Sequence, residues 1–192
     1  FDELNDLAKK YDIPQLRGIY SNKRGTAIMS MGDGVLKVNP DRLSFTATQK
    51  RFVDGMNRIN KTNVSLATYK SWKYGDKSID WRYKGKKYDR PFGVDDYLDN
   101  DLEKLRSTMY HEFGHHVHQM KYVNKDTTNY GNYLFKPKVE EQLIQLTGKK
   151  YPSNYAKTNN KEWFAENFSL YENGNRKDLI DPQFIKLIEE LQ

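Results

Sequence analysis

All four histidines of this 192-residue chain fall in one eight-residue segment, HEFGHHVH at residues 111–118. His111 and His115 are four positions apart, so on a helix they project from the same face, one turn apart. Two imidazoles in this arrangement can bind one Zn²⁺ through their ring nitrogens, and Glu112 can reach a water on the metal. In this HExxH pattern the zinc lowers the pKa of the water and the glutamate takes its proton. The segment therefore predicts a hydrolytic zinc site.

The other two histidines and the third ligand are less clearly defined. His118 lies one turn beyond His115, where it is either a group that supports a metal ligand or a partly exposed histidine, and His116 points elsewhere. A catalytic zinc takes three protein ligands and keeps one position open for water. The metzincin pattern needs a histidine ten residues after His111, and position 121 is a lysine. The third ligand is therefore expected to be a carboxylate.

A later segment, KEWFAENFSLY at residues 161–171, offers two candidate carboxylates. Glu162 and Glu166 are four positions apart, so a helix presents both on one face. One could bind zinc while the other accepts the N–H of a ligating imidazole, and the spacing leaves both assignments open. Gly114, beside the second histidine, leaves room for another element to approach closely.

The HEFGH motif and the later run YAKTNNKEWFAE, residues 155–166, together resemble the gluzincin branch of zinc peptidases. They are most similar to anthrax lethal factor-like catalytic domains and Pro-Pro endopeptidases, and also to metallopeptidase domains of phage head-associated and polymorphic toxin proteins. The resemblance covers about residues 101–173. It implies that Glu162 is the third zinc ligand, that Glu166 orients a histidine, and that Tyr155 donates its hydroxyl to the oxyanion. A preference for Pro-Pro bonds is not carried over.

The histidines are expected to lie on the clearest helix of the chain, at about residues 101–122. Asn100 and Glu103 form a plausible capping pair at its start. An apolar stripe follows at steps of three or four, formed by Leu102, Leu105, Met109, Phe113, Val117 and Met120. The histidine pair is expected at one edge of this stripe.

The remaining elements are predicted from periodicity and turn residues. Upstream we expect a helix at 2–10, a β-hairpin turning at 31–34, a helix at 48–59, and one or two strands near Ile79, Trp81 and Tyr83. Downstream we expect a helix at about 137–147 closed by Gly148, a helix at about 160–172 capped by Thr158 or Asn159, and a last helix from Asp181-Pro182 to Leu191. The sheet therefore comes early and the helices late.

The composition limits the class of protein. Hydrophobic residues make up 36% of the chain and the net charge is +6, with the basic residues dispersed. A solvated surface explains these lysines better than a patch for an acidic partner, and no nucleic-acid-binding motif accompanies them. The chain has no apolar run long enough for a membrane span and no visible signal peptide. It starts at Phe rather than Met, which suggests trimming and leaves a lost leader open.

The absence of cysteine excludes disulfides, thiolate catalysis and cysteine-bound zinc. The cysteine count suits a cytosolic protein or a secreted bacterial one and does not decide between them. A secreted bacterial or phage-associated protein is the expectation that we favour.

These observations predict one metallopeptidase domain over residues 1–192, with an α+β, zincin-like fold. We expect a sheet-containing half at about 1–98 and a helical half with the zinc site at 99–192. The protein is expected to be a monomeric zinc-dependent endopeptidase that cleaves a protein or peptide substrate, with the hairpin around residues 26–39 offering an edge strand to it. Two alternatives stay open: a non-catalytic zinc-containing module, such as a phage virion component, and a toxin peptidase that acts inside a target cell. The substrate itself is not predicted.

Overall fold

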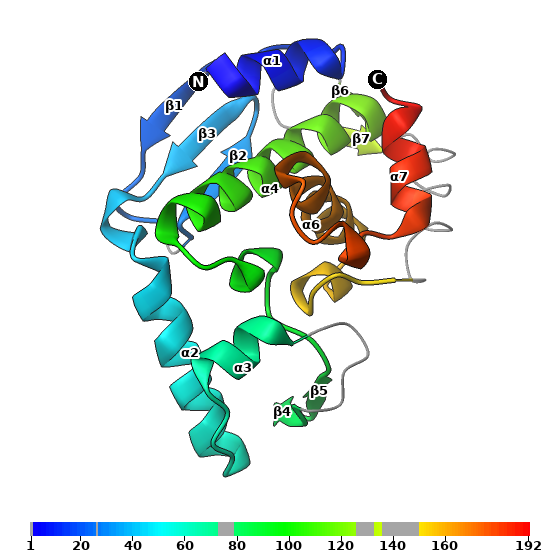
Figure 1. Ribbon diagram of the computed structural model, residues 1–192. Helices are drawn as coiled ribbons and strands as arrows, with labels where there is room; N and C mark the ends of the chain where they lie inside the picture. The colour runs from blue at the N-terminus through cyan, green and yellow to red at the C-terminus, as the bar shows by residue number, and fades with distance from the viewer. Residues whose placement is uncertain (1, 26, 73–78, 126–132, 136–149) are drawn as a thin grey trace.

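The computed structural model describes residues 2–25, 27–72, 79–125, 133–135 and 150–192, and the chain is a mixed α+β protein (Figure 1). The helix expected at about 137–147 and Gly148 lie outside the described residues. The described α-helices are α1 Asp2–Lys10, α2 Phe45–Asn60, α3 Leu66–Ser71, α4 Asp101–Tyr122, α6 Asn160–Asn173 and α7 Pro182–Glu189. The strands are β1 Gly18–Ser21, β2 Met29–Gly32, β3 Val35–Val38, β4 Trp81–Tyr83, β5 Lys86–Tyr88, β6 Val123–Lys125 and β7 Tyr133–Phe135.

The predicted hairpin is confirmed as the β2–β3 pair, which is antiparallel. Its turn is formed by Asp33 and Gly34, which both have positive φ, at 51° and 72°. Two consecutive residues with positive φ form a type I′ turn, whose twist matches that of the two strands in a hairpin with a two-residue loop. Strand β1 was not predicted, because it has only four residues and most of them are exposed. It pairs in parallel with β3. The order β1-β3-β2 leaves β2 at an edge of the sheet.

Helix α4 runs through the middle of the molecule, between the sheet and α6 (Figure 1). The predicted cap is confirmed, because Asn100 Oδ1 accepts the backbone N–H of Glu103 at 2.8 Å. The predicted apolar stripe is correct at Phe113 and Val117, which are fully buried, and wrong at Leu102, whose side chain is 75% exposed. Leu102 lies on the solvent-facing side of the first turn of α4, whereas Lys104 in the same turn is buried.

Helix α4 packs closely against α6, and a glycine makes the approach possible. A Cβ on Gly114 would lie 3.0 Å from both the Cα of Ala165 and the Cβ of Phe168. The close approach predicted at Gly114 is therefore confirmed. Helix α6 begins at the expected cap, Asn159, whose Oδ1 accepts the N–H of Glu162 at 3.0 Å, and it ends at Gly174 with φ at 69°.

The buried hydrophobic residues form two clusters. The larger joins α1, the three-stranded sheet, α4, α6 and α7, in the upper part of Figure 1. The smaller joins α2, α3 and β4 below it, and its largest buried side chains are Tyr69, Trp72 and Trp81. The clusters are bridged by the short 3-10 helix η2 Val94–Tyr97, where Val94 and Tyr97 belong to the larger cluster.

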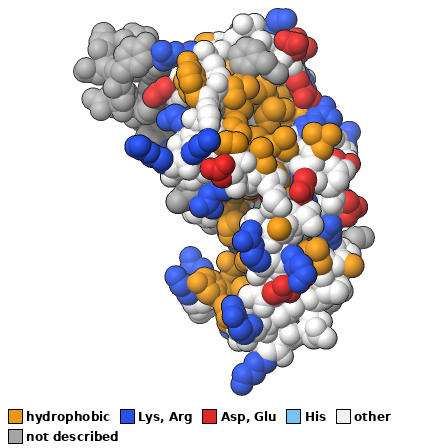
Figure 2. Space-filling model, turned by 90° about the vertical axis from the view of Figure 1, so that its left-hand side faces the viewer, with side chains coloured by type: hydrophobic (Ala, Val, Ile, Leu, Met, Phe, Trp, Pro, Cys, Tyr) orange, Lys and Arg blue, Asp and Glu red, His pale blue; other side chains and the backbone are white. Residues whose placement is uncertain are grey.

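The first half contains the three-stranded sheet together with the helices α1 and α2, which were expected at 2–10 and 48–59, and the short helix α3, which was not expected. The second half is mainly helical, and it also contains the β6–β7 pair, which was not predicted and whose first strand directly follows α4. On the face shown in Figure 2, Lys and Arg side chains are interspersed with Asp and Glu. Among the helices in the described parts of the chain, none has the length and apolar character needed to cross a membrane.

Candidate metal centre

Three side chains predicted as metal ligands come together between α4 and α6. His111 Nε2 and His115 Nε2 lie 3.2 Å apart, and Glu162 Oε2 lies 3.1 Å from the first and 3.3 Å from the second. Three corners of a tetrahedron with metal–ligand bonds of 2.0–2.1 Å are about 3.4 Å apart. These three residues therefore form a group that can hold a metal ion.

The chemistry of the three atoms also fits a cation. Glu162 Oε2 is buried and receives no hydrogen bond of good geometry from the described residues. Two unprotonated imidazole nitrogens and a carboxylate oxygen are all electron-pair donors, so their approach is unfavourable unless a proton or a metal lies between them. A shared metal ion satisfies all three atoms at once.

The pKa values of His111 and Glu162 also indicate that positive charge is stabilised between these side chains. Burial disfavours its charged form, yet the adjacent carboxylates of Glu162 and Glu166 outweigh burial and raise the pKa of His111 to about 10. Burial alone would raise the pKa of Glu162, but the two imidazoles hold it well below its usual range. In the metal-free protein the site therefore keeps a proton, which a metal ion has to displace.

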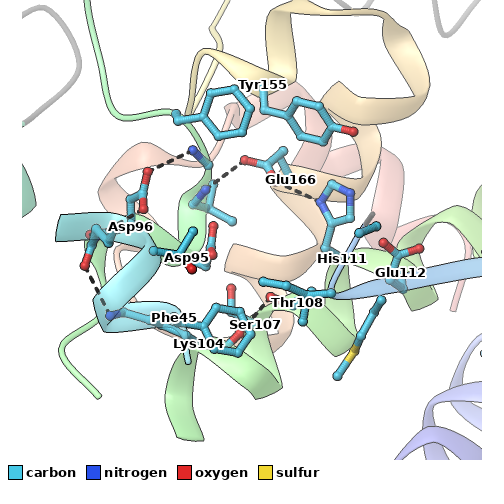
Figure 3. A pocket seen from close by; sticks show the side chains of 18 of the residues that line it. Phe45, Asp95, Asp96, Lys104, Ser107, Thr108, His111, Glu112, Tyr155 and Glu166 are labelled. Carbon is cyan, nitrogen blue, oxygen red and sulfur yellow. Dashed lines mark hydrogen bonds and ion pairs between the residues drawn. The ribbon is translucent and has the colours of Figure 1, made fainter. Parts of the chain in front are cut away.

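Glu166 occupies a different position from Glu162, one turn along α6. Its Oε1 lies 2.8 Å from Nδ1 of His111, the ring nitrogen that faces away from the ligand group. Its Oε2 accepts the backbone N–H of Val94 at 2.8 Å and the hydroxyl of Ser153 at 2.5 Å. Glu166 is thus fixed from two sides and can hold the imidazole of His111 in one orientation and tautomer (Figure 3).

Tyr155 lies against the site from the 3-10 helix η3 Tyr155–Lys157. Its ring stacks on His111 with centroids 5.8 Å apart, and its backbone N–H donates to the carbonyl of Phe92 at 2.7 Å. Burial, reinforced by the negative charges of Glu162 and Glu166, raises the pKa of Tyr155 to about 12. Its phenol therefore keeps its proton at neutral pH and can donate a hydrogen bond. Glu112 lines the same pocket as His111 and Tyr155.

The two remaining histidines lie outside the ligand group. His118 is only 2% exposed and packs against the rings of Tyr122 and Phe164, so its interpretation as a partly exposed residue is wrong. Burial, with smaller contributions from His115 and Lys161, lowers the pKa of His118 to about 3. His116 points elsewhere, as expected, and its Nε2–H donates to the carbonyl of Pro14 at 2.9 Å.

A pocket of about 370 Å³ opens beside the ligand group, and sequence reasoning missed most of its wall. Its residues come from β2 and the segment before it, from α2, from the segment 92–96 and from α4. The overlooked charged residues are Asp95, Asp96 and Lys104. The two consecutive aspartates after Gly93-Val94 are the sequence feature that could have indicated Asp95 and Asp96.

The chain was compared with protein families, with curated proteins and with solved structures. No family model, no curated protein and no solved structure matches the chain. The function is therefore inferred from the residues of the site and from their geometry.

Proposed function

We propose that this protein is a zinc-dependent endopeptidase of the gluzincin type, with a zincin-like fold. The main support for the proposal is that one possible ligand atom from each of His111, His115 and Glu162 lies close to the other two. Glu112 lines the adjoining pocket. Two imidazole nitrogens and one carboxylate oxygen are a common ligand set of catalytic zinc, which leaves a fourth position open. A structural zinc has four protein ligands, and the group found among the described residues has three, which favours catalysis over a purely structural role.

The chain's own residues then have distinct tasks. A bound zinc ion would supply a Lewis acid that activates water and polarises the scissile carbonyl. Glu112 accepts a proton from the attacking water and passes it to the leaving amine. Tyr155 donates its hydroxyl to the oxyanion that develops at the carbonyl, which its raised pKa permits. Glu166 keeps His111 in the orientation that binds the metal.

The sheet offers a place for the substrate backbone. Strand β2 is an edge strand, and its first residue, Met29, lines the pocket together with Ala27, Ile28 and the metal ligand His111. An extended peptide can add to such an edge through main-chain hydrogen bonds, which positions one peptide bond over the site. A sheet edge beside the helix that bears the HExxH motif is the arrangement expected of a zincin-like peptidase.

The decisive experiment is the substitution Glu112→Gln, which keeps the shape of the side chain and removes its basicity. We expect the variant to bind one zinc ion with unchanged affinity and to lose about 10²–10⁴-fold in peptidase activity. Glu103→Gln is the matched control, because Glu103 is an exposed glutamate near the start of the same helix. Activity of Glu112→Gln equal to that of the control would refute the proposed mechanism.

A further inference from the structure

The wall of the pocket is continuous with the proposed catalytic centre. Aromatic rings line it in succession, with centroid distances of 5.9 Å from Phe52 to Phe92, 5.5 Å from Phe92 to Tyr155 and 5.8 Å from Tyr155 to His111. Phe45 of α2 adds a further apolar surface. A substrate side chain next to the scissile bond therefore enters a pocket that is apolar along its sides and of a size suited to one long side chain.

Most charged groups of this wall are already paired within the protein. The carboxylate of Asp96 is fully engaged within the protein: its Oδ2 accepts the hydroxyl of Tyr69 at 2.6 Å and the N–H of Gly93 at 3.3 Å. Its Oδ1 accepts the amide of Gln49 at 3.1 Å. Asp96 is thus occupied by internal donors from three segments.

Lys104 is equally occupied, although its side chain is almost fully buried. Its Nζ donates to Thr46 Oγ1 at 3.1 Å and to Gln49 Oε1 at 3.2 Å, and lies 3.8 Å from Asp101 Oδ1. Glu166 is held by its contacts with α4, Val94 and Ser153. These groups are therefore committed to the fold and are not available to a ligand.

Asp95 differs from its neighbours (Figure 3). Its carboxylate lines the pocket, and no lysine, arginine or histidine among the described residues forms an ion pair with it. Burial raises the pKa of Asp95, and the negative charges of Asp96 and Glu166 raise it further, while the attraction of His111 opposes them and does not cancel them. A cation placed against this carboxylate would remove the repulsion, whereas an apolar group would leave it desolvated without compensation.

We infer that this pocket binds a lysine or arginine side chain of the substrate, adjacent to the scissile bond, and that Asp95 is the residue that selects it. The inference rests on the proposed peptidase function. The aliphatic part of the basic side chain packs between Phe45, Phe52 and Phe92, and its cation reaches Asp95. The aromatic faces add a favourable cation–π interaction. An acidic side chain is excluded by the carboxylates of Asp95, Asp96 and Glu166.

The first test compares peptides that differ at one position. A peptide library locates the cleavage site, and each flanking position is then varied among lysine, norleucine and glutamate. Norleucine keeps the stem of lysine and lacks its charge, so the ratio of the two kcat/KM values isolates the contribution of the cation. We expect lysine to be preferred over norleucine by about tenfold or more at one position, with glutamate the poorest.

Substitution of Asp95 tests whether this residue causes the preference for lysine over norleucine. Asp95→Asn should lower kcat/KM for the lysine peptide by about tenfold and bring the lysine-to-norleucine ratio close to one. Asp99→Asn is the matched control, because Asp99 is exposed, lies outside the pocket wall and pairs with Lys70. It should keep the full ratio. An Asp95→Asn variant that keeps the full ratio would overturn the role of Asp95.

A binding measurement separates recognition from turnover. Zinc-loaded Glu112→Gln holds substrate without cleaving it, so fluorescence anisotropy can compare the dissociation constants of the lysine and norleucine peptides. We expect the lysine peptide to bind about tenfold more tightly. Cleavage of both peptides with equal kcat/KM by the unmodified protein would overturn this inference and leave the peptidase function standing. Failure to cleave any peptide, with zinc bound, would overturn the peptidase function itself and the inference with it.

Discussion

Replacement of Gly114 by alanine tests the contact on which the metal group depends. The new Cβ would lie 3.0 Å from the Cα of Ala165 and from the Cβ of Phe168, closer than nine in ten Cβ contacts in proteins. A backbone atom cannot move aside alone, so α6 as a whole has to shift away from α4. Because Glu162 is carried by α6 and both imidazoles by α4, the shift also moves the carboxylate away from the two imidazoles of the candidate metal-binding group.

The size of the effect follows from two opposing contributions. Alanine in a helix interior is favoured over glycine by about 1 kcal/mol, whereas overpacking costs about 1–3 kcal/mol. Gly114→Ala should therefore destabilise the protein by about 1 kcal/mol net. Gly55→Ala in α2 is the matched control, because a Cβ added at Gly55 would meet nothing within 4 Å. It should stabilise by about 1 kcal/mol. The difference between the two variants, about 2 kcal/mol, measures the overpacking alone, because the helix-propensity gain cancels.

Urea unfolding of the metal-free variants, followed by circular dichroism, gives these free energies. Calorimetric zinc titration then shows whether Gly114→Ala also weakens metal binding while Gly55→Ala does not. If Gly114→Ala stabilised the protein as much as Gly55→Ala, the two helices could not be in the close contact described. Unchanged zinc affinity in a destabilised Gly114→Ala variant would show instead that the ligands are not positioned by this contact.

Three further predictions concern the metal centre. Glu162→Ala should abolish stoichiometric zinc binding, whereas Glu166→Ala should weaken it by about 10–100-fold, and equal losses in a calorimetric titration would contradict the separate positions of the two carboxylates. Because the pKa of His111 is raised to about 10 in the metal-free protein, zinc binding at pH 7 should release about one proton, and affinity should fall about tenfold for each pH unit below 10. Calorimetry in buffers of different ionisation enthalpy measures that proton, and a value near zero would show that His111 is already neutral. Tyr155→Phe should lower kcat/KM by about 10²–10³-fold at unchanged zinc affinity, and an equal loss of zinc would assign the tyrosine to metal binding instead.

The elements that the sequence predicted well are those fixed by neighbours along the chain. The cap at Asn100, the turn at Asp33-Gly34 and the placement of His111 and His115 on one helix face all depend on residues within four positions of one another. Strand β1 was missed because a four-residue, mostly exposed strand has no pattern of its own and is defined by its partner β3.

Within the site, the sequence by itself determined which residues could bind a metal, namely the histidine pair of the HExxH motif and one of two later carboxylates, and it indicated Tyr155 as a hydrogen-bond donor beside them. Only the tertiary structure decided that Glu162 faces both Nε2 atoms while Glu166 faces Nδ1 of His111, because both carboxylates lie on the same face of α6. It also placed Asp95 in the pocket wall, where no basic side chain of the described residues forms an ion pair with its carboxylate. Helical spacing sets the direction of a side chain about its own axis, but the partner that it meets depends on how distant segments pack.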